Sequence, residues 1–95
     1  MNIKEQGENF LRLRQERRAV AEEVASILAA LRKFGLGLAA DAKSLKDNPA
    51  MWQPDAESFC ADVHQAVNNA NRYRELLGQD ADIQAALDRY EAAGL

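Results

Sequence analysis

The chain has 95 residues, a net charge of −3 and hydrophobic residues at 47% of its positions. This length supports a single helical-bundle domain, 1–95, whose core is too small to stabilise a two-helix hairpin without help, so we expect self-association. Threonine is absent, glycine and proline are few, and alanine, leucine, glutamate and arginine are abundant. This composition predicts an all-α fold without strands.

The first predicted helix covers about residues 8–46, because its apolar residues recur in steps of three and four without losing phase. This is the spacing of a coiled-coil seam, which packs against another helix. Gly35 and Gly37 each cost about 1 kcal/mol relative to alanine, so a bend or break there is the alternative to a continuous helix. The apolar seam consists of Ile3, Phe10, Leu13, Val20, Val24, Ile27, Leu31, Phe34, Leu38 and Leu45.

The next predicted elements are a connector and a second helix. Asp47-Asn48-Pro49 ends the first helix, since asparagine favours turns and proline keeps the preceding residue extended. We expect a connector over residues 48–53 and a second helix over about 54–77, with Pro54 in its first turn. The face expected to be buried consists of Phe59, Val63, Ala66, Ala70, Tyr73 and Leu77.

Gly78 predicts the end of the second helix, because glycine is the commonest residue just beyond a helix C-terminus. Asp80 then predicts the N-cap of a short third helix over about 80–93. That helix would bury Ile83, Leu87 and Tyr90. We therefore predict a long helical hairpin with a short C-terminal helix, completed to a bundle by self-association.

Two polar residues interrupt the first seam beyond its first turn, Arg17 and Asp41. An antiparallel pair of first helices about a two-fold axis near Ala29 would place Arg17 opposite Asp41 of the other chain, with apolar layers elsewhere. The alternative packs the seam against the second helix of the same chain. The predicted oligomer interface consists of Leu13, Arg17, Val20, Val24, Ile27, Leu31, Phe34, Leu38, Asp41 and Leu45.

The residues give little support for catalysis. Cys60 and His64 have a spacing that can chelate zinc, but the chain has no other cysteine or histidine. We expect Cys60 to be a buried, reduced thiol on an apolar helix face and His64 to lie at its edge. We therefore predict no catalytic residues, no metal site and no cofactor.

Two further groups are candidate binding sites. Arg12, Arg14, Arg17 and Arg18 could hold an anion, although nearby glutamates can pair with them. Met51 and Trp52 lie in the connector, where the tryptophan either seals the end of a bundle or forms a partner-binding hot spot.

A tryptophan in the turn of a helical hairpin of this size resembles the type VII-secreted Trp-x-Gly family, and that resemblance implies export as a hairpin. The turn here reads Trp52-Gln53-Pro54, with proline where that family has glycine. Neither Tyr73 nor Tyr90 is followed four residues later by the aspartate or glutamate of the family's export signal. We assign no family.

Charge is distributed unevenly along the chain. Residues 1–46 have an excess of basic groups, and residues 47–95 have an excess of acidic ones. This asymmetry suits packing within or between chains, and makes nucleic-acid binding a minor alternative. We expect a cytoplasmic, non-enzymatic interaction protein, a homodimer first of all, that binds another protein as an adaptor, chaperone or inhibitor. The alternative is an oligomer that sequesters a nucleotide or another anion at the arginines.

Overall fold

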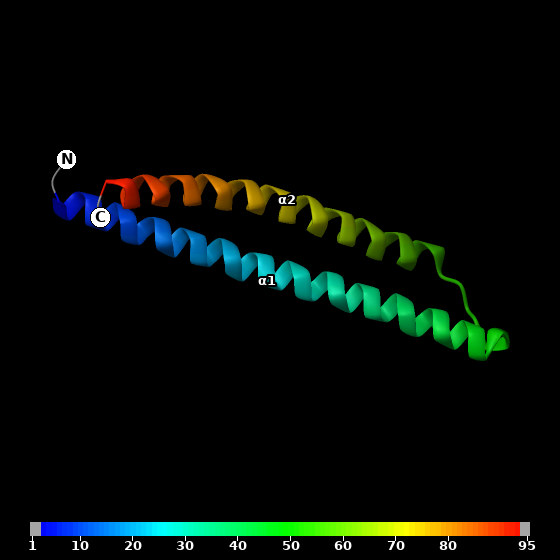
Figure 1. Ribbon diagram of the computed structural model, residues 1–95. Coiled ribbons are helices and arrows are strands. Elements are labelled where there is room, and N and C mark those ends of the chain that lie inside the picture. Colours follow the sequence, from blue (N-terminus) through cyan, green and yellow to red (C-terminus); the bar gives the residue numbers. More distant parts are fainter. Residues whose placement is uncertain (1–2, 94–95) are drawn as a thin grey trace. The chain divides into compact units, whose positions relative to one another are not determined.

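The computed structural model describes residues 3–93, and all of its regular elements are helical. Helix α1 spans Ile3–Asp47, the short 3-10 helix η1 spans Pro49–Met51, and helix α2 spans Ala56–Ala92 (Figure 1). No strand occurs in the described range, which agrees with the composition. The all-α prediction and the plan of two long helices are therefore confirmed.

Helix α1 runs without interruption through Gly35 and Gly37. Its apolar residues keep the same phase before and after these glycines, so one helix can present them all on one face. The prediction of a continuous helix is confirmed, and the alternative of a break is wrong.

The predicted division into a second and a third helix is wrong, because α2 continues through Gly78 to Ala92. Gly78 lies inside the helix, and Asp80 is not an N-cap. The side chain of Asp80 accepts a hydrogen bond from Nε of Arg17 at 3.0 Å. Asp80, which its local sequence predicts to be an N-cap, is therefore a residue in the middle of α2 that pairs with Arg17 of α1.

The connector begins where the sequence predicts but ends two residues later. The amide of Asn48 donates to the carbonyl oxygen of Ser44 at 2.9 Å and closes the last turn of α1. The N-cap of α2 is Asp55, whose Oδ1 accepts a hydrogen bond from the Ser58 amide at 3.0 Å. Pro54 precedes this cap, so its predicted place in the first turn is wrong.

The chain forms two compact units, each of which contains part of both helices. Within the described residues, unit 1 comprises 3–25 and 73–93, where the blue start of α1 lies beside the red end of α2 (Figure 1). Arg17 pairs with Asp80, and the rings of Phe10 and Tyr90 meet edge to face at 6.0 Å. These contacts make unit 1 an antiparallel helix pair.

The buried face of α2 in unit 1 differs by one residue from the prediction. Leu76 is 1% exposed, whereas Leu77, the predicted core residue, is 48% exposed. Steps of three and four that include Asp80 lead from Tyr73 through Leu76 to Leu87, which is also buried. Because α2 continues through Gly78, Asp80 joins the seam, and this continuous phase directs Leu76 inward and leaves Leu77 outside.

Unit 2 is Ser26–Arg72 and contains the second part of α1, the connector and the first part of α2. Within it, Ile27 is the one buried hydrophobic residue among those described. Most apolar side chains of this unit are exposed or half-buried. The packing of unit 2 is therefore much more open than that of a protein core.

Candidate functional site

Unit 2 contains a groove of about 1200 Å³ between its two helical segments and the connector. Its walls come from α1 between Ala30 and Leu45, from Asn48 and residues 51–55 of the connector, and from α2 between Ala56 and Asn69. We call this space the unit 2 groove. All of its lining residues belong to unit 2.

The wall formed by α1 is the second part of the predicted seam. Leu31 and Phe34 are half-buried, and Leu38 is 39% exposed. Leu45 lies further along the same face and is also exposed. Apart from Asp41, the seam positions of this wall are apolar along about four helical turns, a surface that a coiled-coil helix buries against a partner.

The wall formed by α2 does not complement this apolar surface. Between Ala56 and Asn69 it presents Asp62, Gln65 and Asn69, with small residues such as Ala66 beside them. Polar side chains lose hydration when they are packed against leucine, so the two helices of unit 2 gain little by closing together. The sequence of α2 therefore leaves the α1 seam open.

Unit 1 shows how the same α1 seam packs when α2 matches it. There α2 presents Leu76, Ile83, Leu87 and Tyr90, all of them buried or half-buried. The difference between the units lies mainly in α2, since α1 has an apolar seam in both. The groove is thus a property of the residues between Ala56 and Asn69.

Met51 and Trp52 lie at the connector end of the groove and contribute to its lining. Trp52 is 61% exposed, and Met51 is more exposed still. A ring that sealed the end of a bundle would be covered, so this exposure favours the alternative in which Trp52 is available to a partner.

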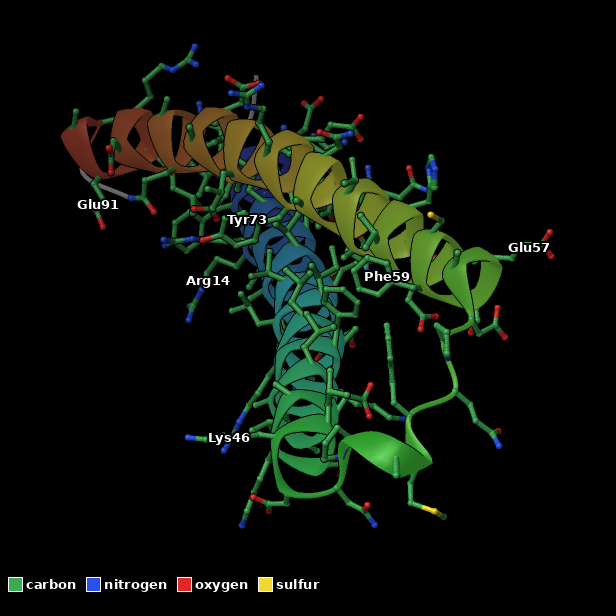
Figure 2. The ribbon with its side chains drawn as sticks, turned by 90° about the vertical axis from the view of Figure 1, so that its right-hand side faces the viewer. Arg14, Lys46, Glu57, Phe59, Tyr73 and Glu91 are labelled. Carbon is green, nitrogen blue, oxygen red and sulfur yellow. The ribbon has the colours of Figure 1, made fainter. Side chains whose placement is uncertain are left out.

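Phe59 is the one large apolar residue that the first turns of α2 add to the groove. Figure 2 shows it on the side of α2 that faces α1, while Lys46 on α1 and Glu57 on α2 point away. Phe59 was predicted to be buried, but it is 52% exposed. The residue has the expected orientation and lacks a partner side chain large enough to cover it.

Three carboxylates and one lysine are the charged residues of the lining. Asp41 comes from α1, Asp55 from the connector and Asp62 from α2, while Lys33 is the basic residue. Asp55 is already engaged as the cap of α2. The charge of the lining is therefore net acidic.

The four predicted anion-binding arginines lie on α1, and each has a contact within the chain. Arg12 pairs with Glu16 at 3.8 Å, and Arg18 pairs with Glu22 at 3.3 Å. The guanidinium of Arg14 lies 5.9 Å from the centre of the Phe10 ring, and Arg17 holds Asp80. These contacts are those of a salt-bridged helix surface.

The cysteine does not occupy the position that the sequence suggests. Cys60 is an exposed free thiol, so its predicted burial is wrong, and His64 is also exposed. The phase of α2 explains the difference, because Phe59 takes the inward position and Cys60 falls beside it. Within residues 3–93, no group of three or more histidine, cysteine, aspartate and glutamate side chains could hold a metal ion.

The structure divides the predicted interface residues between two environments. Leu13, Arg17, Val20 and Val24 belong to unit 1, and Ile27 is buried in unit 2. The remaining residues, Leu31, Phe34, Leu38, Asp41 and Leu45, all line the unit 2 groove. Arg17 contacts Asp80 of its own chain, so its pairing with Asp41 of a second chain stays a prediction.

Sequence reasoning did not identify Asp62 as a site residue. Its signal was available, since Phe59, Asp62 and Ala66 follow the same steps of three and four as the α1 seam. A carboxylate at such a position in α2 parallels Asp41 in α1.

Fold and site together define a helical protein with an open, mostly apolar groove between two helices. Comparison of the chain with known protein families, characterised proteins and solved structures gives no match. Neither described helix is apolar enough over a sufficient length to cross a membrane.

Proposed function

We propose that this is a non-enzymatic helical interaction protein that binds a helix of another protein in the unit 2 groove. The observation that supports the proposal is the unmatched seam of α1, whose Leu38 and Leu45 stay exposed while α2 opposes them mainly with polar and small residues. A third helix laid along this wall would bury the seam and so supply the missing layer of the bundle.

The exposed connector supports the same proposal. Tryptophan is enriched among the residues that dominate binding energy and methionine is enriched in interfaces, and Trp52 and Met51 lie at one end of the groove. An adaptor, a chaperone or an inhibitor would each use such a surface. Self-association remains part of this proposal, since a second chain is also a source of helices.

Site-specific photo-crosslinking tests the proposal with a matched pair of positions. Leu38 lines the groove, whereas Leu36, two residues earlier on α1, is 60% exposed and lies outside the lining. Benzoylphenylalanine placed at Leu38 and expressed in the native cell should form a discrete protein adduct. The same group at Leu36 should not, because that face of α1 has no groove.

The mass of the adduct identifies its origin. An adduct of twice the chain mass of 10.5 kDa would indicate a second copy, and any other discrete mass would indicate a different protein. Equal labelling from both positions, or none from either, would contradict binding in the groove.

A further inference from the structure

The unit 2 groove contains two carboxylates at seam positions, and neither has a basic partner. Asp41 lies between Leu38 and Leu45 on α1, and Asp62 lies between Phe59 and Ala66 on α2. Among the described residues, no ion pair involves either aspartate. A helix that covered the groove would therefore also cover two negative charges, which is costly unless a positive charge accompanies it.

Unit 1 shows how this fold accommodates a carboxylate in a seam. Asp80 occupies a seam position of α2 between Leu76 and Ile83, and Nε of Arg17 on α1 lies 3.0 Å from its Oδ1. Arg17 itself belongs to an otherwise apolar stripe. The helix that packs against an acidic seam in this protein thus carries one basic residue among its leucines and valines.

The dimensions of the groove suit one helix. An α-helix with its side chains is about 10–12 Å across and rises about 5.4 Å per turn, so 1200 Å³ corresponds to about two to three turns. The α1 wall from Ala30 to Leu45 is about 23 Å long, enough for a helix of this length.

Resting on the proposed function, we infer that the occupant of the unit 2 groove is an amphipathic helix of another protein with a lysine or arginine inside its apolar stripe. The basic side chain of the bound helix forms ion pairs with the carboxylates of Asp41 and Asp62. If a second copy docked groove to groove, the three aspartates and one lysine of one groove would instead face the three aspartates and one lysine of the other. Like charges that face each other destabilise such an interface, so charge complementarity favours the basic helix.

Two designed peptides of about two heptads, a length that the α1 wall can accommodate, test this inference on the full chain. Both have leucine at the seam positions and uncharged outer faces, and they differ only at the central seam position, which is lysine in one and glutamate in the other. Sedimentation verifies that the free peptides are monomeric. Trp52, the only tryptophan of the chain, reports docking through a shift of its emission to shorter wavelength.

We expect the lysine peptide to bind the wild type about tenfold more tightly than the glutamate peptide, since close interfacial charge pairs couple at this level or above. The preference should fall at high salt. In the double variant Asp41→Asn/Asp62→Asn the two peptides should bind equally. Glu57→Gln, which removes a charge that points away from the groove, should keep the preference (Figure 2).

Each contrary result has a distinct meaning. If both peptides shift the Trp52 emission with equal affinity, or if the preference survives in the double variant, the acidic recognition is wrong while helix binding in the groove stands. If neither peptide changes the emission, the proposed function fails as well. If the wild type is already a dimer with Trp52 shielded before any peptide is added, the occupant is a second copy and the inference is overturned.

Discussion

Arg17 illustrates how one side chain changes the interpretation of a seam. The sequence predicts that Arg17 pairs with Asp41 of a second chain. In the structure Arg17 contacts Asp80 of its own chain. The side chains of Arg17 and Asp80 are 47% and 33% exposed, so water screens the pair. Such a pair contributes about 0.2–1 kcal/mol to stability, and its main effect is to favour one register of α1 against α2.

Charge reversal separates the contact within the chain from the predicted contact between chains. Arg17→Asp and Asp80→Arg should each lower the melting temperature, because each places two like charges together. The double reversal should recover most of the loss when unfolding is followed by circular dichroism.

A second double-mutant cycle, between Arg17 and Asp41, tests the predicted dimer. If Arg17 meets Asp41 of another chain, then Asp41→Arg should restore dimerisation to Arg17→Asp in sedimentation. A monomeric wild type would contradict that dimer. The contact within unit 1 would be contradicted if the variant Arg17→Asp/Asp80→Arg were no more stable than either single variant.

At the scale of elements, the sequence predicts helices well and their ends less well. The constant phase of its apolar residues predicts that α1 continues through Gly35 and Gly37, and Asn48 followed by Pro49 predicts where it ends. The predicted helix end at Gly78 is wrong because packing against α1 outweighs the local preference of glycine for a helix terminus. The cost of one glycine is about 1 kcal/mol, less than the gain from burying a leucine such as Leu87 in unit 1.

The candidate site was predictable only in part. Its α1 wall and the connector residues Met51 and Trp52 followed from apolar periodicity and from their position between prolines. The groove itself did not, because it depends on which α2 residues oppose α1, a tertiary pairing that sequence periodicity does not specify. Asp62 and Phe59 acquire their roles only from that pairing.

Gly78→Ala tests the continuity of α2. Apart from its chain neighbours and the nearby backbone of α2 itself, no atom lies within 4 Å of the position that a Cβ would take there, and the backbone is helical. Alanine should therefore stabilise the protein by about 0.5–1 kcal/mol and raise the melting temperature by a few degrees. Ala81→Gly, one turn later on the same helix, should have the opposite effect. A helix that ended at Gly78 in a left-handed conformation would instead lose stability with alanine.

At the scale of the whole molecule, stability is unequally shared between the units. Unit 1 contains Leu76 and Leu87 in its core, whereas the helical segments that line the groove in unit 2 have exposed seams. Local opening requires less free energy where fewer apolar contacts are lost. The unit 2 groove is therefore the region in which binding can most increase order.

Hydrogen exchange measures this difference directly. Backbone amides of residues 34–47 and 60–69 should exchange faster than those of residues 10–24 and 76–90, and a bound helix should slow exchange in the first set. Comparison at a single pH and temperature in the free protein provides the reference. Uniform protection along both helices would show that the groove does not weaken unit 2.

Cys60 has a consequence for experiments on this protein. It is the only cysteine, it is exposed, and it follows Phe59 on α2. The sequence has no second cysteine for a disulfide within the chain, so oxidation joins two chains, forms a mixed disulfide with a small thiol or converts the thiol to a sulfur oxyacid. The covalent dimer formed in this way would mimic self-association, so oligomeric states should be compared with and without reductant, and in Cys60→Ser.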